Sequence, residues 1–301
     1  MKQTGKLYVV GIGPGSYEQM TIKAVRAMEE SQVVVGYTVY ADLMREHFPG
    51  KEWITTPMRQ ETERCRMAIE KAEAGMTVAL ICSGDAGVYG MSGLILELVG
   101  ESDSPIVEVI PGVTAALSGG ALLGAPLGHD FAVISLSDLL TPMELIEDRL
   151  LHAAKADLAI CLYNPSSRKR SDYLRRACDI MLTAKKPETV CGIAKNIGRE
   201  GESMELMTLS ELRDTFTDMF TTCLLYTSTV VLVCDVAYRH GTDAFPGVMG
   251  GEEDSVLFPD IPGVGVDHRQ RDHGASCHSQ LHADKSFPFR LPEACLHGIG
   301  Q

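Results

Sequence analysis

Residues 6–37, KLYVVGIGPGSYEQMTIKAVRAMEESQVVVGY, decide the fold of this chain. The apolar run at their start has the character of a buried strand and leads into a glycine-rich turn. Residues 21–32 mix apolar and charged side chains as a helix does, and a second apolar strand is predicted over 32–40. This β-α-β order predicts a mostly parallel sheet with helices on both of its faces.

The same alternation continues along the chain and predicts two α/β domains. After a helix at 59–75, a strand at 76–82 and further elements up to 124, a stretch rich in Gly, Pro and Ala intervenes, and the pattern restarts with a strand at 131–138. We predict an N-terminal α/β domain over 1–120 and a second over 121–228, with a cofactor cleft between them. Residues 229–301 are predicted to be an atypical, disordered tail.

The bulk composition excludes several classes of protein. The chain has 301 residues, 45% of them apolar, and a formal net charge of −13. This acidic balance argues against a nucleic-acid partner, because binding to phosphates requires clustered Lys and Arg; a local basic pocket can still bind an anionic small molecule. Apolar runs stay below the roughly 18 residues of a membrane span. We therefore expect a cytoplasmic protein with no membrane partner.

The first glycine-rich loop, from Gly11 to Ser16, is close to the dinucleotide-binding pattern GxGxxG but departs from it. Its last position is Ser16, Pro14 removes a backbone donor, and no acidic residue ends the second strand. No Gly-Lys-Ser/Thr sequence follows, so the Walker pattern fails as well. A nucleotide-binding oxidoreductase is disfavoured, and a purely structural turn is the alternative for this loop.

Two further loops follow predicted strands. SGDAGVYG at 83–90 places Asp85 where its carboxylate can accept hydrogen bonds from an amine or a ribose hydroxyl, and an N-cap of the next helix is the alternative. PGVTAA at 111–116 occupies the equivalent place after another strand. Open α/β sheets bind ligands at the carboxyl ends of their strands, which predicts that these loops form a site.

In this order and spacing, the three loops resemble those of the tetrapyrrole methylase family. The family carries a GxGPG loop, a helix opening with Thr-x-Lys-Ala (here at 21–24), a Gly-Asp loop and PGV[ST]A. Further stretches are similar to the precorrin-3B C-17-methyltransferase branch of the family: VVVGYTVY at 33–40, SGDAGVYGM at 83–91, APLGHDFAVISLSD at 125–138, LYNPSSRKR at 162–170 and AKNIGREGE at 194–202. The resemblance covers about residues 5–222.

The resemblance implies an enzyme of cobalamin biosynthesis that works as a homodimer. It would use S-adenosylmethionine to methylate C-17 of precorrin-3B or of its cobalt-containing counterpart, cobalt-factor III, with contraction of the corrin ring. A methylase of the same superfamily acting on another ring position is the alternative, and ribosomal RNA is disfavoured as a substrate by the acidic charge. Whether the substrate contains cobalt stays open.

The resemblance also implies which residues contact S-adenosylmethionine. They belong to the three loops and to the second domain: Pro14, Gly84, Asp85, Val88, Thr114, Ala115, Tyr163, Asn164 and Ala194. Ala86 is a departure, because many family members have proline after the Gly-Asp pair, but Gly87 and Gly90 still permit the bend. Methyl transfer from a sulfonium to carbon depends on alignment and desolvation more than on a strong base, so no catalytic triad is expected.

The substrate implied by the resemblance carries several carboxylate arms, so Arg and Lys should line its binding site. The candidates are Arg59, Arg168, Lys169, Arg170, Lys195 and Arg199. A solvated loop is the alternative for the basic run at 168–170. His129 and Asp130 are candidates for proton transfer during ring contraction, whereas bracing the domain junction is the alternative for His129.

The resemblance stops at about Cys223. Lys285 is the sole lysine beyond residue 222, and amphipathic helical periodicity is missing there, which predicts a frameshift or a chimeric join and leaves an inactive polypeptide as a possibility. CLLYTS at 223–228 is the last segment expected to add a strand. The tail holds the histidines and cysteine of an alternative metal site, whose spacing does not match a zinc finger, so no metal is predicted: His268, His273, Cys277, His278 and His282. The nine scattered cysteines are predicted to be mostly buried reduced thiols.

Overall fold

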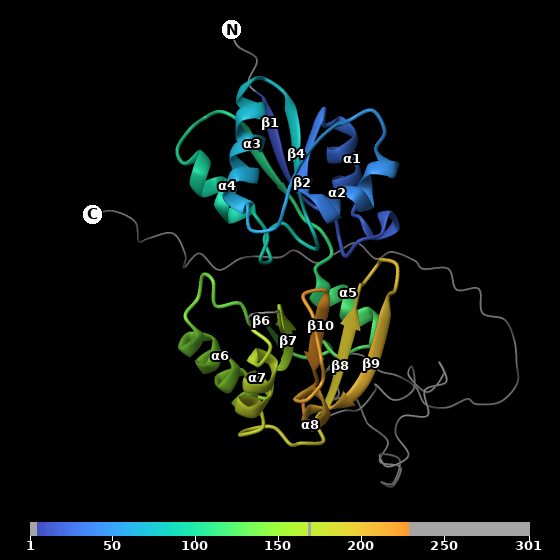
Figure 1. Cartoon of the computed structure of the whole chain (residues 1–301), viewed down its shortest axis with the longest axis vertical. Helices are drawn as coiled ribbons and strands as arrows, with labels where there is room; N and C mark the ends of the chain where they lie inside the picture. The colour runs from blue at the N-terminus through green and yellow to red at the C-terminus, as the bar shows by residue number, and fades with distance from the viewer. Residues whose placement is uncertain (1–4, 168–169, 229–301) are drawn as a thin grey trace, which may run out of the picture. The chain divides into compact units, whose positions relative to one another are not determined.

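The computed structural model describes residues 5–167 and 170–228. All of them belong to one compact unit of the chain, Met1–Pro246. They form two five-stranded sheets with helices against both faces of each (Figure 1). The two sheets with their helices confirm the predicted α/β architecture. Within the described residues, no helix is both long enough and apolar enough to cross a bilayer.

The first sheet is parallel throughout, with the spatial order β3-β2-β4-β1-β5. Its strands are β1 (Lys6–Gly11), β2 (Val33–Tyr37), β3 (Glu52–Thr56), β4 (Thr77–Cys82) and β5 (Ile106–Ile110). Strands that are buried on both faces are apolar almost continuously, which explains the sequences of β1, β2 and β4.

Helices cover both faces of this sheet. Figure 1 shows α1 (Ile22–Glu30) and α2 (Thr38–Met44) on one face, and α3 (Glu61–Glu73) and α4 (Ser92–Val99) on the other. Each pair closes its own apolar core against the sheet. Single 3-10 turns, η1 (Tyr17–Gln19) and η2 (Arg45–His47), follow β1 and α2.

The structure corrects two predictions in this half of the chain. The second strand ends at Tyr37 and not at Tyr40, because the chain turns into α2 at Thr38. Strand β3 was not predicted from its sequence, EWITT, which shows no regular apolar alternation. It lies at the edge of the sheet and is partly exposed, so few of its side chains need to be apolar.

The second sheet has the order β6-β7-β10-β8-β9. Its strands are β6 (Phe131–Ser135), β7 (Ala159–Tyr163), β8 (Val190–Lys195), β9 (Ser203–Thr208) and β10 (Thr221–Leu225). β6 and β7 run parallel, whereas the other three pairings are antiparallel. The mostly parallel sheet expected from the first half of the chain is thus confirmed there, whereas the second sheet is mixed. β10, the last of these strands along the chain, lies in the middle.

Four helices pack on the second sheet. α5 (Ala115–Leu122) covers one face, and α6 (Met143–Lys155), α7 (Tyr173–Met181) and α8 (Leu209–Leu212) cover the other. The boundary predicted between residues 120 and 121 falls inside α5, which packs against β8 and β10. The predicted tail over 229–301 lies outside the described residues.

The chain remains bonded to the second sheet beyond β10. The backbone N–H of Tyr226 donates to the Val190 carbonyl at 3.0 Å, and its hydroxyl donates to the Leu123 carbonyl at 3.0 Å. Two residues later, the Ser228 N–H donates to both carboxylate oxygens of Asp157 at 3.0 Å. The predicted last strand at 223–228 is therefore displaced, since β10 covers Thr221–Leu225 and the following residues form an anchored end.

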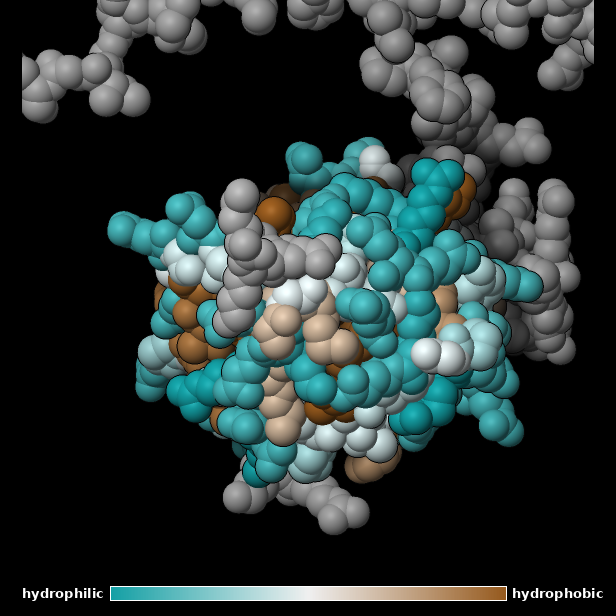
Figure 2. Space-filling model, turned by 90° about the horizontal axis from the view of Figure 1, so that it is seen from above, coloured by the Kyte–Doolittle hydropathy of each residue, from teal (hydrophilic) through white to brown (hydrophobic). Residues whose placement is uncertain are grey.

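The six described cysteines are free and buried: Cys65, Cys82, Cys161, Cys178, Cys191 and Cys223. Burial raises the pKa of the Cys161 thiol to about 12. The predicted burial is confirmed for these six, while Cys234, Cys277 and Cys295 lie outside the described residues. On the face seen in Figure 2, hydrophilic residues cover most of the described surface and hydrophobic residues form small separate patches.

Candidate functional site

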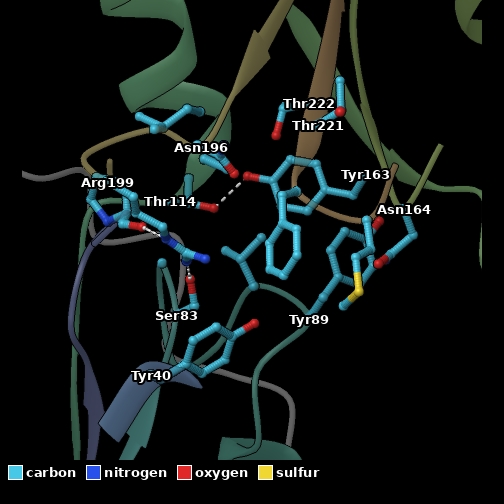
Figure 3. Close-up of a pocket in the computed structure, with 17 residues that line it drawn as sticks. Tyr40, Ser83, Tyr89, Thr114, Tyr163, Asn164, Asn196, Arg199, Thr221 and Thr222 are labelled. Atoms are coloured by element: carbon cyan, nitrogen blue, oxygen red, sulfur yellow. Dashed lines mark hydrogen bonds between the residues drawn. The ribbon is translucent and has the colours of Figure 1, made fainter. Parts of the chain in front are cut away.

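One pocket is lined by residues from both sheets (Figure 3). Its walls come from the loops that follow β1, β4 and β7, from the start of α5, and from residues on or next to β8 and β10. Seven of the nine residues implied for cofactor binding line it: Pro14, Gly84, Val88, Thr114, Ala115, Tyr163 and Asn164. The structure therefore brings together the three loops that the sequence singles out.

Glycines allow these loops to touch. The N–H groups of Gly13 and Gly84 each donate to the carbonyl of the other, at 3.0 and 2.7 Å, so the first two loops pair like short antiparallel strands. Gly13 and Gly84 both have φ near +70°, a conformation that costs little for glycine alone. A Cβ added to Gly112 would lie 2.2 Å from the Gly84 carbonyl oxygen. A side chain at Gly112 would therefore force the loops apart.

Asp85 organises the loops and does not line the pocket. One carboxylate oxygen accepts from the N–H groups of Gly87 and Val88, at 2.7 and 3.1 Å, and the other accepts from the Gly112 N–H at 2.9 Å. The next helix, α4, begins at Ser92 with Met91 as its N-cap. Asp85 is thus not the cap that the sequence offered as an alternative. Three of the roughly four acceptor sites of its carboxylate bind the loop backbone, and its direct contact with the cofactor stays a prediction.

Tyr163, at the end of β7, connects the pocket to α5. Its hydroxyl oxygen accepts from the Ala116 N–H at 2.6 Å and shares a hydrogen bond of 2.6 Å with the Thr114 hydroxyl. Burial raises the pKa of Tyr163, so the phenol stays protonated at neutral pH. Thr114 is the N-cap residue of α5, which fixes the third loop at the mouth of that helix.

Tyr89 links the second loop to β6. Its hydroxyl donates to the Val133 carbonyl and accepts from the Ser135 N–H, each at 3.0 Å, so it pairs with β6 as a neighbouring strand would. Its ring lies 5.5 Å from that of Tyr163 on the pocket wall. The backbone φ of Tyr89 is +53°, an uncommon value for a tyrosine that these contacts maintain.

Ala194 lies behind the pocket and does not line it. It is fully buried in β8, and a Cβ at Gly119 of α5 would lie 3.4 Å from the Ala194 side chain. A small residue at this position lets α5 approach the second sheet closely. Direct contact of Ala194 with a ligand, as implied by the resemblance, gains no support from this placement.

Arg199 is the basic candidate that lines the pocket. Its Nε donates to the Pro14 carbonyl and its Nη2 donates to the Ser83 hydroxyl, both at 2.9 Å. The guanidinium also lies over the rings of Tyr40 and Phe220, at 5.4 and 5.6 Å from their centroids. Burial lowers the pKa of Arg199 from its ordinary value, although the group stays charged at neutral pH.

The other basic candidates that the structure describes do not line the pocket. Lys195 forms an ion pair with Asp218 at 2.8 Å, and Arg170 lies 3.7 Å from Asp138. Arg59 is exposed in the loop before α3, with φ +67°. Arg168 and Lys169 lie outside the described residues.

His129 and Asp130 are exposed and precede β6. They lie at its amino end, while the pocket lies at the carboxyl ends of β6 and β7, about 17 Å away along a strand of five residues. The structure does not bring this pair to the pocket, and their catalytic role gains no support from the geometry.

Several pocket residues were not predicted: Tyr40, Ser83, Tyr89, Asn196, Ile197, Met219, Phe220, Thr221 and Thr222. The sequence offered a signal for three of them. Ser83, Tyr89 and Asn196 belong to motifs quoted above and are adjacent to residues predicted to bind the cofactor or the substrate. Thr221 and Thr222 begin β10, and their place depends on the insertion of that strand between β7 and β8. Within 5–167 and 170–228, no three His, Cys, Asp or Glu side chains are grouped to hold a metal ion, and the tail candidates fall outside these ranges.

Comparison with known proteins gives a family match over most of the described chain. The model of the tetrapyrrole (corrin/porphyrin) methylases matches residues 6–213. A relative from Salmonella typhimurium named as a probable cobalt-factor III C(17)-methyltransferase is 49% identical over 207 residues, which are 68% of this chain and 86% of the relative. A precorrin-3B C(17)-methyltransferase from a Sinorhizobium species is 38% identical over 226 residues, 74% of this chain and 88% of that protein.

A cobalt-factor III methyltransferase from Priestia megaterium is 41% identical over 237 residues, which are 77% of this chain but 44% of the relative, so the chain spans less than half of that protein. The crystal structure of the methyltransferase CobJ superposes with a TM-score of 0.70 and 33% identity, covering 76% of this chain and 97% of that one. A uroporphyrin-III C-methyltransferase from Thermus thermophilus, solved with S-adenyl homocysteine, has a TM-score of 0.57 and 23% identity over 74% of this chain and 92% of its own, and shares the fold.

Proposed function

Because the chain belongs to the tetrapyrrole (corrin/porphyrin) methylase family, we propose that this methyltransferase acts on C-17 of precorrin-3B or cobalt-factor III. In this proposal S-adenosylmethionine supplies the methyl group, and methylation accompanies contraction of the corrin ring during cobalamin biosynthesis. The names of the Salmonella and Sinorhizobium relatives support the ring position, because the chain covers most of the length of both.

The convergence of three glycine-rich loops on one pocket is the observation that carries the proposal. Pro14, Gly84 and Thr114 come from separate strand ends and line a single wall region. Backbone groups exposed by glycine loops can approach a ligand closely, as nucleoside binding requires. Opposite them, the hydroxyl and amide groups of Asn164, Asn196, Thr221 and Thr222 provide further donors and acceptors. Such a wall fits a polar, nucleoside-containing cofactor.

The pocket can align reactants without a strong base. Its described lining holds no Asp, Glu, His or Lys side chain. Burial raises the pKa of Tyr40 and of Tyr163, so both of these hydroxyls stay protonated at neutral pH. Displacement at a sulfonium methyl releases a neutral thioether, so orientation and exclusion of water provide the main rate enhancement. Ser83 and Tyr89 of the second loop line this space together with Arg199 (Figure 3).

We further infer that the enzyme acts as a homodimer in the cytoplasm on a tetrapyrrole and on no nucleic acid. The buried free thiols of the described chain are compatible with a reducing compartment. The net charge of −13 disfavours RNA. Light scattering of the purified protein measures the subunit number directly, and a monomer at micromolar concentration would contradict the dimer.

Two measurements test the proposed function. Isothermal titration with S-adenosylhomocysteine should give a dissociation constant of roughly micromolar order, with NAD and ATP binding far more weakly. Incubation with S-adenosylmethionine and either precorrin-3B or cobalt-factor III under anaerobic conditions should add one methyl group, placed at C-17 by NMR. A methyl group at another ring position would replace the C-17 assignment, and tight NAD binding without S-adenosyl ligand binding would refute the proposal.

A further inference from the structure

Arg199 is the one charged side chain among the described residues that line the pocket. The remaining lining residues are uncharged polar, aromatic or aliphatic. A ligand held there therefore meets a single formal charge, which is positive. Because a charge in a partly buried site acts through a lower dielectric than in water, this group has a strong influence on which ligand groups bind beside it.

Within the described part of the chain, no Asp or Glu carboxylate oxygen lies within 4.0 Å of the Arg199 guanidinium. By contrast, its neighbour in sequence, Lys195, is paired with Asp218 at 2.8 Å. The hydrogen-bond partners of Arg199 are the Pro14 carbonyl and the hydroxyls of Ser83 and Tyr40, all of them neutral. A half-buried cation without a counter-ion is costly, and an anionic ligand removes that cost.

The guanidinium is held in a fixed position. Arg199 follows Gly198, whose φ is +69° and whose N–H donates to the Glu202 carboxylate at 2.6 Å. A Cβ on Gly15 would lie 2.5 Å from the Arg199 Cγ, so the arginine stem fills a space that only glycine leaves open. Tyr40 and Phe220 contact the guanidinium. Such a fixed fork loses little entropy when it binds an anion.

The guanidinium still has donors to offer. Arginine has five N–H groups in total. The bonds to Pro14 and Ser83 use Nε and one hydrogen of Nη2, and the bond to the Tyr40 hydroxyl uses one more, so two donors remain. Figure 3 shows the guanidinium extending from its turn into the pocket toward Ser83. Nη1, with the second hydrogen of Nη2, forms the outer edge of the fork. This edge has the geometry that binds a planar carboxylate through two parallel hydrogen bonds.

We propose that Arg199 is the carboxylate receptor of this pocket. The identity of the carboxylate rests on the proposed function, which supplies two sources of the same chemistry: the amino-acid end of S-adenosylmethionine and an acetate or propionate arm of the tetrapyrrole. Of the four basic candidates that the structure describes, Arg199 is selected because it lines the pocket and has no acidic partner there. Its bonds to Pro14 and Ser83 hold the fork in place for either carboxylate.

The test compares ligands that differ in their carboxylates, using the full chain and the variants Arg199→Met and Arg199→Lys. For the cofactor, titration with S-adenosylhomocysteine is compared with titration by 5′-methylthioadenosine, which has no amino-acid carboxylate. Loss of a charged hydrogen bond should weaken S-adenosylhomocysteine binding to Arg199→Met by about 10- to 100-fold, while 5′-methylthioadenosine binding changes far less. Arg199→Lys should retain part of the affinity, because it keeps the charge but loses the fork.

The second comparison distinguishes the tetrapyrrole source. Uroporphyrin III, with eight carboxylates, and its octamethyl ester are titrated by fluorescence quenching. If Arg199→Met weakens the binding of uroporphyrin III but not that of its octamethyl ester, Arg199 binds a carboxylate of the tetrapyrrole substrate. Arg213→Met is the matched control, since Arg213 is bound to Asp179 at 2.6 Å and does not line the pocket. It should change neither comparison.

The inference fails if Arg199→Met leaves both comparisons unchanged, because Arg199 is then a structural link between the pocket walls. A ratio of two affinities within one variant is insensitive to general damage to the pocket, and Arg199→Lys provides a folded protein if Arg199→Met unfolds. Failure of the proposed function gives a different result: the unaltered chain then binds neither S-adenosylhomocysteine nor 5′-methylthioadenosine, and the porphyrin comparison alone decides the role of Arg199.

Discussion

Asp85 lies in one of the sequence motifs of the pocket, and its side chain binds the backbone of two pocket loops. Its two carboxylate oxygens bind three backbone N–H groups, of Gly87, Val88 and Gly112. Two of these belong to its own loop and one to the loop after β5, so the side chain holds two pocket loops together. We infer that Asp85 supports ligand binding by shaping the wall that Gly84 and Val88 form.

Asp85→Ala should therefore lower both stability and cofactor affinity. Losing a charged acceptor that satisfies three donors should reduce the free energy of unfolding by about 1–3 kcal/mol, measured by urea denaturation. S-adenosylhomocysteine binding should weaken in parallel because the loops lose their common anchor. Asp103→Ala, an exposed aspartate in the α4–β5 connection, serves as the control and should change neither quantity. Unchanged stability with weaker binding would instead indicate direct contact with the ligand.

At the scale of an element, the end of β10 depends on an ion pair between the buried Lys185 and the partly exposed Asp157. The Lys185 side chain is 2% exposed and its Nζ lies 2.8 Å from the Asp157 carboxylate, which also accepts hydrogen bonds from Ser228. Burial alone would raise the pKa of Asp157, but the hydrogen bonds from Lys185 and Ser228 outweigh burial and lower it. A carboxyl with a lowered folded-state pKa stabilises the fold above its unfolded value, and this contribution is lost as the pH falls through the folded value.

Asp157→Asn should destabilise the protein at pH 7 and flatten its acid dependence. Breaking a fully buried pair costs about 3–5 kcal/mol. The Asp157 side chain is 40% exposed, so we expect about 1–3 kcal/mol here, discounted for screening by solvent. The unaltered chain should lose this contribution below about pH 4, given an unfolded pKa of about 3.9. Urea denaturation between pH 3 and 7 measures both effects, and parallel pH curves for the two proteins would contradict the assignment.

At the scale of the whole described molecule, side-chain bonds connect the loops of the first sheet to the second sheet around the pocket. Arg199 binds Pro14 and Ser83, Tyr163 binds Thr114, and Tyr89 binds β6. Each bond joins residues far apart in sequence. The pocket is consequently a property of the joined pair of sheets, and weakening one link should loosen its walls while leaving each sheet intact.

Tyr89→Phe tests this link. Removing the hydroxyl deletes two hydrogen bonds to β6. Because Tyr89 is 57% exposed, the free energy of unfolding should fall by only about 1 kcal/mol or less. Hydrogen exchange at residues 83–91 and 131–135 should nevertheless increase, and S-adenosylhomocysteine should dissociate faster. Tyr17→Phe is the control, because the structure gives the Tyr17 hydroxyl no hydrogen bond within the described residues. Equal exchange in both variants would show that Tyr89 does not hold the loop.

Two truncations test the extent of the folded molecule. A chain ending at Ser228 should express as soluble protein and bind S-adenosylhomocysteine as the full chain does, which also tests the prediction, outside the described residues, that 229–301 are dispensable. A chain ending at Met219 lacks β10, the central strand of the second sheet, and should fail to fold that sheet. Circular dichroism and titration distinguish the two, and loss of binding in the longer chain would make the tail part of the enzyme.

The sequence predicted the loops of the site better than the pairing of its side chains. Glycine turns after apolar strands are local signals, so the positions of Pro14, Gly84 and Thr114 were readable. Whether Lys195 or Arg199 has an acidic partner depends on where Asp218 lies after folding, which no local pattern encodes. The antiparallel pairing of β8 with β10 was not predicted for the same reason. The two strands are separated in sequence by β9, which is largely exposed, so no local pattern indicates that they are neighbours.

The central place of β10 has a consequence for synthesis on the ribosome. A growing chain that has emerged as far as β9 holds β6–β7 and β8–β9 as two separate halves, because their common neighbour has not yet been made. The second sheet closes only after Thr221–Leu225 leaves the exit tunnel, and that same strand brings Thr221 and Thr222 to the pocket. Prematurely terminated products therefore cannot assemble this pocket. Their unpaired strand edges stay exposed, so chaperones and proteases can bind them.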